Sequence, residues 1–539
     1  IDVMLLGHWI EMRSVMGASG ALQSLVQLMP HTAYRLTDSG ETEEVSVTEL
    51  GAGERVLVKP GQKVPTDGVI AEGTSTFDEA LLTGESTPVR KGEGAEVIGG
   101  AVNGEEAVTV EVTKTGDQTY LSQVVEMVRK AQESRSHTQD MADTAARWLT
   151  YIALTAGGLT LLSWLALGRD FEFSLERMVT VMVITCPHAL GLAVPLVVAI
   201  STSMGANSGL LIRDRAAFER ARRLDAVVFD KTGTLTEGRF GVQEVAAFGD
   251  SAEDEVLRLA ASLEGASEHP IARGIVASAR ERGLERARAE GFRNLTGRGA
   301  EAKVENRRLR VVSPAYASEQ GIGTDTAVLE RLGQGGNTVV VVVEEETAIG
   351  AIALADVIRE TSREAVRGLQ AMGIRCMMLT GDGEAVAARV AEELGLDEYF
   401  AGVLPDQKAA RIEEVRSRGL AVAMVGDGVN DAPALVAADL GIAIGAGTDV
   451  AIESADVVLV KDDPAKVLAI IRLSRATFGK MLQNLAWATG YNVVAIPLAA
   501  GVAAGAGILL SPAVGAALMS VSTVIVAVNA RLLRRTETA

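Results

Sequence analysis

The sequence predicts a multidomain protein that combines an α-helical transmembrane bundle, a β-rich domain and a Rossmann-like α/β domain with an α+β insertion. Three patterns predict this fold class. Apolar runs alternate with polar stretches, Val-rich segments alternate with turn residues near the start, and apolar strands alternate with helical stretches further on. A chain of 539 residues is too long for one compact domain, and 48% hydrophobic content suits soluble domains combined with spans.

Charge and cysteine content narrow the classes of function. The net charge of −19 argues against nucleic acid as a partner, because phosphate backbones are bound by clustered Lys and Arg. The cysteines are Cys186 and Cys376, so no disulfide framework is expected, and Cys376 is expected in the core. Ile1 to Trp9 has neither an initiating Met nor a signal-peptide pattern, and we interpret it as the tail of a helix cut off upstream.

The β-rich domain and the helical segments follow one another along the chain. Val-rich segments between His31 and Thr115 predict strands, and the polar stretch from Tyr120 to Arg147 predicts helix. Apolar runs over 148–167, 178–203, 485–506 and 507–530 have about the length of membrane spans. Cytoplasmic flanks are indicated by two groups of arginines: Arg213, Arg215, Arg220, Arg222 and Arg223, and then Arg531, Arg534 and Arg535.

The most informative motif is an apolar strand that ends in a carboxylate. Residues 226–229 run into Asp230, and small turn-forming residues follow as far as Thr236. Ligands of open α/β sheets gather beyond the carboxyl ends of the strands, so Asp230 is a candidate nucleophile for a phosphoryl group. A strand that ends in Asp is also common, and this motif alone leaves both interpretations open.

Two further segments repeat this design. Residues 374–379 run into Thr380-Gly381-Asp382, and residues 420–425 run into Gly426-Asp427. Helical stretches over 384–394 and 407–418 separate them, so the three strands are expected to be parallel and to end at one edge. Lys408 reaches that edge from the start of its helix.

The residue types at this edge suit phosphoryl transfer. Asp230 and Asp427 suit Mg²⁺, a hard cation that prefers oxygen ligands. Thr380 and Lys408 suit the equatorial oxygens of a phosphoryl group in transfer. The sequence has no Gly-x-x-x-x-Gly-Lys-[Ser/Thr] loop, which disfavours a P-loop ATPase.

The second apolar run contains a sulfur ligand between helix breakers. Pro187 and Pro195 each remove a helical N–H, so the helix must bend or unwind, and transporters build ion sites at such breaks. Cys186 and His188 favour copper, silver or zinc over Na⁺, K⁺ or Ca²⁺. The structural alternative is a kinked helix with a buried Cys and a hydrogen-bonded His. Later spans supply a soft donor and oxygen donors in Met519, Asn492 and Ser520, although small hydroxyls also hold helices together.

Together these motifs resemble the P-type ATPases, whose phosphorylation domain belongs to the haloacid dehalogenase superfamily. The resemblance covers nearly the whole chain and includes Thr83-Gly84-Glu85-Ser86, at the place of the family's dephosphorylation loop. Glu268-His269-Pro270 and Gly297-Arg298-Gly299 resemble the nucleotide-binding domain of the heavy-metal (CPx-type) ATPases. Cys-Pro-His with Met519 to Thr523 resembles their copper-transporting subgroup, so copper follows from the resemblance and the ligand types alone leave silver and zinc open.

The resemblance implies a domain order. The expected parts are a transmembrane bundle, a β-rich actuator domain, a HAD-like α/β phosphorylation domain and an inserted α+β nucleotide-binding domain. The expected ranges are 1–30 for the tail of a truncated transmembrane helix and stalk, 31–120 for the actuator domain, 121–210 for the stalk and a transmembrane hairpin with Cys-Pro-His, 211–237 and 354–480 for the phosphorylation domain, 238–353 for the nucleotide-binding domain, and 481–535 for the last two transmembrane helices.

The resemblance also implies roles for single residues. Asp230 takes the γ-phosphate of ATP, Lys408 neutralises charge, and Glu85 positions the water that hydrolyses the aspartyl phosphate. Asp230, Asp427 and the backbone at Thr232 hold Mg²⁺. The remaining expected residues are Thr380, Asp382, Asn430 and Asp431 in the catalytic group, Glu264, His269, Gly297 and Gly299 around ATP, and Cys186, His188, Asn492, Met519 and Ser520 around the transported ion.

The expected function is copper export driven by ATP through an aspartyl phosphate, with spans in the cell membrane and catalytic domains in the cytoplasm. The expected ligands and partners are ATP, Mg²⁺, copper ions, the lipid bilayer, and a copper chaperone or reductant. The rival functions are a silver or zinc pump, a membrane-tethered phosphatase of the same superfamily, and a metal sensor without turnover. Gly383 and Gln407 depart from the family, which usually has Asn and an acidic residue there.

Overall fold

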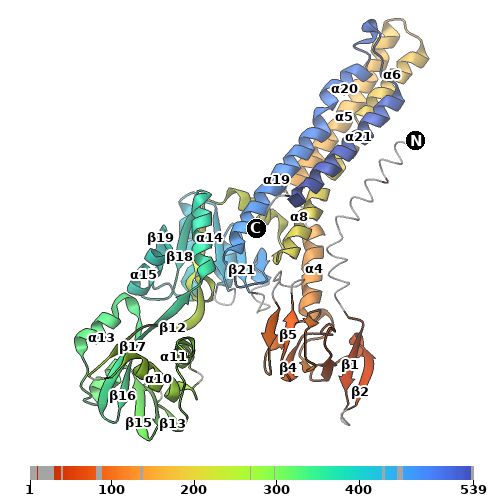
Figure 1. Ribbon diagram of the computed structural model, residues 1–539. Helices are drawn as coiled ribbons and strands as arrows, with labels where there is room; N and C mark the ends of the chain where they lie inside the picture. Colours follow the sequence, from red (N-terminus) through yellow and green to blue (C-terminus); the bar gives the residue numbers. More distant parts are fainter. Residues whose placement is uncertain are drawn as a thin grey trace.

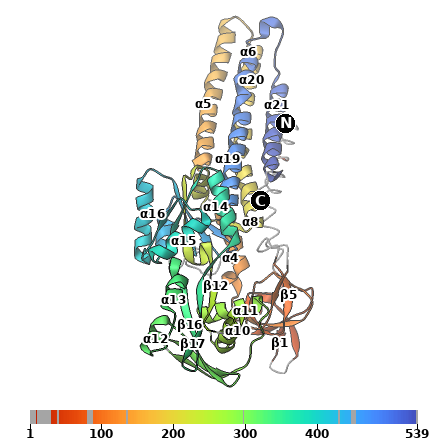
Figure 2. The same ribbon diagram turned by 60° about the vertical axis from the view of Figure 1, so that its left-hand side comes forward.

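The computed structural model describes Trp9 and residues 30–37, 41–79, 88–133, 137–249, 251–267, 269–295, 298–427, 431–445 and 453–535. A long helical bundle forms one end of the molecule, and an α/β domain follows it (Figure 1). Two further domains lie beyond the α/β domain, one on each side in Figure 1, and Figure 2 shows the same order from another direction. The multidomain fold class predicted from the sequence is confirmed.

The β-rich domain contains two sheets. Six strands pair in the order β2-β1-β3-β9-β4-β7, and three pair in the order β6-β5-β8. Alternate side chains such as Val56, Val110 and Ile70 are fully buried, as expected where one face of a sheet covers a core. The strands are β1 (Thr32–Leu36), β2 (Thr42–Ser46), β3 (Arg55–Val58), β4 (Gly68–Glu72), β5 (Ser75–Asp78), β6 (Val89–Lys91), β7 (Glu96–Val97), β8 (Val102–Asn103) and β9 (Val108–Val112).

The α/β domain is built on a seven-stranded sheet in the order β10-β22-β21-β20-β11-β18-β19. All neighbours pair in parallel except β10 and β22. Its strands are β10 (Leu210–Ile212), β11 (Ala226–Asp230), β18 (Arg375–Leu379), β19 (Glu398–Phe400), β20 (Val422–Gly426), β21 (Leu440–Ile444) and β22 (Val457–Leu459). Its helices are α9 (Arg215–Arg220), α14 (Glu360–Ala371), α15 (Glu384–Leu394), α16 (Lys408–Ser417) and α17 (Ala432–Ala437).

The inserted domain is a six-stranded antiparallel sheet in the order β12-β17-β16-β15-β14-β13. Two long strands, β12 (Thr236–Ala247) and β17 (Thr347–Ile358), join it to the α/β domain, and the boundaries expected at 238 and 353 fall inside them. The other elements are β13 (Ala289–Leu295), β14 (Gly299–Val304), β15 (Arg307–Val312), β16 (Thr338–Glu344), α10 (Glu253–Glu264), α11 (Pro270–Glu281), α12 (Pro314–Glu319) and α13 (Thr326–Leu332).

The helical bundle contains three stretches that are long and apolar enough to cross a membrane within the described ranges, over Thr138–Ala166, Phe171–Asn207 and Pro512–Arg535. The run expected at 485–506 instead continues α19 and breaks at Tyr491. The helices are α4 (Tyr120–Glu133), α5 (His137–Ala166), α6 (Phe171–Ile184), α7 (His188–Ala193), α8 (Pro195–Asn207), α19 (Lys466–Gly490), α20 (Asn492–Ala499) and α21 (Pro512–Arg531).

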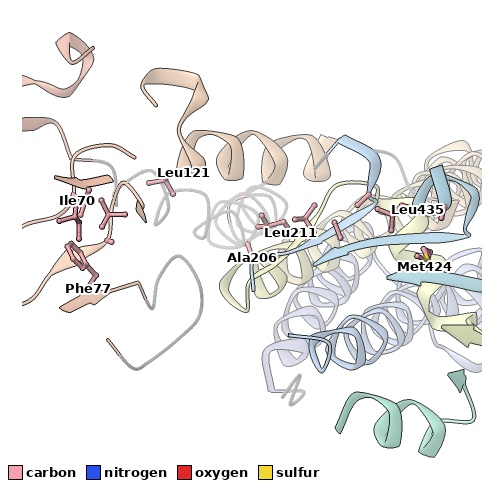
Figure 3. Packing of buried hydrophobic residues seen from close by; sticks show 14 of the residues in the cluster. Ile70, Phe77, Leu121, Ala206, Leu211, Met424 and Leu435 are labelled. Atoms are coloured by element: carbon pink, nitrogen blue, oxygen red, sulfur yellow. The ribbon is translucent and has the colours of Figure 1, made fainter. Parts of the chain in front are cut away.

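Buried apolar side chains run from the β-rich domain to the α/β domain past the base of the bundle (Figure 3). Ile70 and Phe77 lie at one end of this cluster, and Met424 lies at the other. Leu121 on α4 and Leu211 on β10 lie between them. The β-rich domain therefore connects to the sheet through α4 and the strand that leaves the second span.

Candidate active site

Three strand ends meet at one edge of the parallel sheet. Asp230 is the last residue of β11, Thr380 follows β18, and Asp427 follows β20. The register aligns Asp230 with Leu379, so the first two ends lie side by side. β20 pairs with the other side of β11. The convergence predicted from the three motifs therefore follows from parallel pairing.

Lys408 joins two carboxylates at this edge. Its Nζ lies 2.6 Å from Asp230 Oδ1 and 2.6 Å from Asp431 Oδ1, and all three side chains are buried. Lys408 is the first residue of α16, so its long side chain extends from a helix start to the sheet edge. Gly426 permits the approach of Asp431, because a Cβ at residue 426 would lie 2.2 Å from Asp431 Oδ2.

Burial and neighbouring charges act in opposite directions on the pKa values of Asp230, Asp431 and Lys408. Burial raises the pKa of Asp230, and the negative charge of Asp431 raises it further, against the opposite effect of Lys408. Burial likewise raises the pKa of Asp431, against the effect of Lys408. Burial alone lowers the pKa of Lys408, but the Asp230 and Asp431 carboxylates reverse this and the net direction is upward. Burial therefore outweighs Lys408 at both carboxylates, and their pKa values lie above the ordinary range.

The unpartnered carboxylate oxygen of Asp431 is the observation that tests a fit to Mg²⁺. Asp431 Oδ2 is buried without a hydrogen-bond partner, and the charge of Asp427 also acts on Asp230. In the part of the chain that the structure describes, no group of three His, Cys, Asp or Glu side chains is placed to hold a metal alone. Mg²⁺ usually takes only one or two carboxylates and completes its shell with waters and phosphate oxygens. The residues present therefore fit Mg²⁺ that is shared with a phosphate group.

A second polar network beside Asp230 was missed by the sequence reasoning. Lys231 Nζ lies 2.8 Å from Asp382 Oδ2 and 3.2 Å from Asp356 Oδ2. Burial lowers the pKa of Lys231, but its hydrogen bond to Asp382 and the charge of Asp356 make the net direction upward. Arg359 donates to the carbonyls of Gly233 and Thr236 in the turn after Asp230. The signal available in the sequence was the position of Lys231, directly after Asp230.

Thr380 and Thr232 occupy different environments. Thr380 is buried. Its Oγ1 donates a hydrogen bond to Asp382 Oδ2 at 3.1 Å and accepts one from the Asp382 amide. Thr232 lies exposed in the turn of residues 231–235, where Gly233 has a positive φ of 76°. The Thr380 hydroxyl therefore orients Asp382 toward Lys231.

A cavity of about 360 Å³ in the inserted domain gathers the expected ATP contacts that the structure describes. Glu264, His269 and Gly299 line it, from the end of α10, the start of α11 and the start of β14. Arg298, from the expected Gly297-Arg298-Gly299 motif, also lines it. The sequence reasoning missed two other residues of this cavity, which carry amide and hydroxyl groups: Asn294 and Ser313.

Glycine is required at residue 299, and Glu264 is a buried acid beside it. Gly299 has a φ of 140°, and a Cβ there would lie 2.0 Å from the Val311 carbonyl oxygen. Burial raises the pKa of Glu264 to about 7, against a hydrogen bond with Ser267 that lowers it. His269 Nδ1 accepts from the Ile271 amide at 3.3 Å and caps α11.

The expected metal ligands of the bundle are less closely assembled than the charged residues at the sheet edge. α6 ends at Ile184 and α7 begins at His188, so the break predicted at Pro187 is present, and Cys186 is exposed within it. Met519 is buried on α21, where Ser520 donates to the Ala516 carbonyl of its own helix. Asn492 is buried and donates to Ala488, while its Oδ1 has no partner.

Three expected site residues lie outside the described residues. They are Glu85, Asn430 and Gly297. The side chain of His188 also lies outside them, although its backbone begins α7. Their roles remain predictions from the sequence.

Similarity to known proteins places this geometry in a family. Residues 27–129 match the P-type ATPase actuator domain, and residues 224–439 match haloacid dehalogenase-like hydrolases. The chain is 63% identical over 534 residues to the copper-exporting P-type ATPase B of Archaeoglobus fulgidus. The aligned region covers 99% of this chain and 77% of that protein. It is 46% identical over 535 residues to the copper-exporting P-type ATPase B of Enterococcus hirae, with 99% and 72% covered.

Solved structures agree with the sequence relatives. The fold matches the crystal structure of a zinc-transporting PIB-type ATPase in its E2·Pi state, with a TM-score of 0.64 and 34% identity over 99% of this chain and 87% of that one. The parallel edge with Asp230 and Lys408, the cavity in the insertion and the broken helix lie in the matched ranges. The chain therefore belongs to the heavy-metal P-type ATPases, the family that includes the copper-exporting P-type ATPase B of Archaeoglobus fulgidus.

Proposed function

We propose that this chain couples ATP hydrolysis to copper export across a membrane through a phosphorylated Asp230. The observation that carries the proposal is the pair of 2.6 Å contacts from Lys408 to Asp230 and Asp431 at the end of a parallel sheet. A buried lysine holds the carboxylate in place and offsets charge as a phosphoryl group arrives. Copper as cargo is supported by the names of the relatives and by the thiol of Cys186 in a broken span.

In the first half of the cycle, an oxygen of the Asp230 carboxylate attacks the γ-phosphorus of ATP. The bond from that phosphorus to the β,γ-bridging oxygen breaks, and ADP leaves. Lys408 contacts Asp230 and would stabilise the charge on the transferring oxygens. We assign the same role to Thr380, whose hydroxyl would turn from Asp382 to the phosphoryl group. Mg²⁺ bound by Asp230, Asp427 and the Thr232 backbone would supply charge neutralisation between the phosphates.

In the second half, water attacks the phosphorus of the aspartyl phosphate and the acyl phosphate bond breaks, which restores Asp230 and releases phosphate. We assign the positioning of this water to Glu85, with Asn430 and Asp431 in the catalytic group. Asp382 acts through its contacts with Lys231 and Thr380. The nucleotide would occupy the cavity of the insertion, with Glu264, His269 and Gly299 around the adenosine. Gly297 is assigned to the same site from the sequence motif alone.

The transported ion would meet Cys186 and His188 at the break, and Asn492, Met519 and Ser520 on the neighbouring helices. Soft ligands leave silver and zinc as alternative cargoes. The catalytic domains would face the cytoplasm, the spans would lie in the cell membrane, and a copper chaperone or reductant would deliver the ion. The actuator range matched at residues 27–129 weighs against a tethered phosphatase or a sensor without turnover.

The test is phosphorylation of the purified protein in detergent or lipid by γ-labelled ATP, with copper as Cu(I) and Cu(II), Ag(I), Zn(II), or no metal. We expect acid-stable label that depends on copper and disappears in Asp230→Asn. Label that persists in Asp230→Asn would contradict the nucleophile assignment. Stronger stimulation by Zn(II) than by either copper ion would contradict the cargo assignment while leaving the aspartyl phosphate in place.

A further inference from the structure

A line of hydrogen bonds crosses the bundle from a lysine to the helix that follows Cys186. Lys480 Nζ donates to Asn529 Oδ1 at 3.1 Å, and Asn529 Nδ2 donates to Asn484 Oδ1 at 2.8 Å. Asn484 Nδ2 then donates to the Ala193 carbonyl oxygen at 3.1 Å. The line connects α19, α21 and α7, and every donor points toward α7. No role in the proposed cycle uses these residues.

The acceptor at the end of this line is a helix terminus. α7 has only six residues, and Ala193 is its last one, two residues before Pro195. Carbonyls in the last turn of a helix receive no donor from their own helix, and a proline that follows offers no N–H. The Asn484 amide supplies the donor from another helix, and Asn484 is fully buried. The partial negative charge of a helix C-terminus also suits a line that begins at a cation.

α7 carries the start of the metal motif at its other end. Its first residue is His188, and Cys186 lies two residues earlier. Apolar contacts with Leu149, Ala488 and Val526 hold the sides of α7. Such contacts are not directional, so they permit a short helix to rotate or slide. The hydrogen bond from Asn484 is directional and fixes one end of the segment.

We propose that Asn484 is a positioning residue for metal binding, which holds α7 so that Cys186 and His188 face the ion path, with Asn529 and Lys480 orienting its amide. The inference rests on the proposed function, because it assumes that the ion binds at the break. Asn484 does not touch the ion in this proposal. Its removal changes the affinity for the metal and leaves the nucleotide site and the phosphorylation edge unaffected.

The experiment measures phosphorylation from ATP as a function of free Cu(I) and, separately, of Ag(I). Asn484→Ala is expected to raise the half-saturating metal concentration about tenfold, the upper range for one interhelical hydrogen bond. The half-saturating ATP concentration and the phosphorylation from inorganic phosphate without metal stay within about twofold of wild type. Gln483→Ala is the matched control, since Gln483 is the adjacent exposed amide and bonds Lys480 outside the line. It is expected to behave as wild type.

A second variant separates positioning from simple loss of packing. Asn484→Asp keeps an acceptor for Asn529, but it donates to Ala193 only while its carboxyl is protonated. Relative to wild type at each pH, its metal dependence is expected to approach wild type at pH 6 and to worsen at pH 8. Asn529→Ala, one step back along the line, is expected to give a shift in the same direction and smaller than that of Asn484→Ala.

The outcomes distinguish this inference from the proposed function. If wild type is phosphorylated in a metal-dependent way and both Asn484→Ala and Asn484→Asp respond to metal as wild type does, the positioning role is wrong. Equal shifts in Gln483→Ala and Asn484→Ala also overturn it. Absence of metal-dependent phosphorylation in wild type would instead contradict the proposed function. If Asn484→Ala fails to fold, Asn529→Ala still decides, because a metal dependence equal to that of wild type in that variant contradicts the proposal.

Discussion

The proposed catalytic edge of the sheet and the proposed metal path through the helices are positioned in different ways. At the edge, Asp230 and Lys408 come from positions 178 residues apart and meet at 2.6 Å. In the bundle, Asn492 donates back to Ala488 at the end of α19, Ser520 donates within α21, and Cys186 is exposed. The expected site residues therefore converge closely in the first region, and less closely in the second.

The reason lies in backbone pairing. Parallel strands with right-handed connections must deliver their carboxyl ends to one edge, so a residue that follows a strand has a fixed place. Helices in a bundle pack through side chains, and rotation by one residue turns a group by about 100° with little change in length. A chemical group on a helix therefore has no position that sequence spacing alone can fix.

The largest expected effect tests the catalytic edge. Lys408→Met leaves the Asp230 and Asp431 carboxylates buried together without their cation, and breaking a buried pair in this way costs about 3–5 kcal/mol. We expect the single-turnover rate of phosphoenzyme formation at saturating ATP and metal to fall about 100- to 1000-fold. Rapid-quench measurement with labelled ATP gives this rate.

The control lies on the same helix. Arg411 is one turn beyond Lys408 and pairs with Glu414 at an exposed position. Arg411→Met is expected to change the rate less than about twofold, since exposed pairs contribute little. If Lys408→Met forms phosphoenzyme as fast as Arg411→Met does, the contacts of Lys408 with Asp230 and Asp431 do not contribute to catalysis.

Much of the edge could be predicted, and the reasons can be named. Apolar runs ending in Asp230, Thr380 and Asp427 indicated strands, and the intervening helical stretches indicated parallel order. Pro187 and Pro195 likewise predicted the break between α6 and α8, because proline acts on its own helix. Each of these predictions depends on local pattern plus a general topological rule.

Other contacts depend on pairings that local pattern does not encode. Asp356 reaches Lys231 because β17 returns from the insertion and pairs with β12, over 100 residues away along the chain. The line from Lys480 to Ala193 depends on the rotation of three helices, and no spacing in the sequence selects it. The cavity residues Asn294 and Ser313 lie before and after the expected motif at residues 297–299 and have no pattern of their own.

A smaller effect is expected for Asn492 in the bundle. Its Oδ1 is buried without a partner, and a buried polar atom left in that state costs about 1–3 kcal/mol unless another group satisfies it. A bound ion would satisfy it, so Asn492→Ala is expected to raise the half-saturating copper concentration about tenfold. Metal titration of phosphoenzyme formation measures this shift.

The neighbouring Thr489 provides the comparison. Its Oγ1 donates to the Leu485 carbonyl of the same helix at 2.7 Å, so Thr489→Ala is expected to leave the copper dependence unchanged. If both variants match wild type, the unpartnered oxygen of Asn492 does not bind the ion. The expected set of metal ligands then loses Asn492.

The smallest effect concerns Glu264, the buried acid of the cavity that we propose for the nucleotide. Its pKa rises from 4.5 to about 7, so the stability it contributes is present below pH 4.5 and is lost as the pH rises through about 7. Between pH 6 and pH 8 the loss is about 1.4 kcal/mol, a factor of about ten. Glu264→Gln cannot ionise, so hydrogen exchange of α10 amides in wild type should accelerate about tenfold relative to Glu264→Gln over this interval. Glu253→Gln, at an exposed position on the same helix, serves as the control. If the ratio of exchange rates between wild type and Glu264→Gln does not change with pH, the cavity solvates the Glu264 carboxylate as water does.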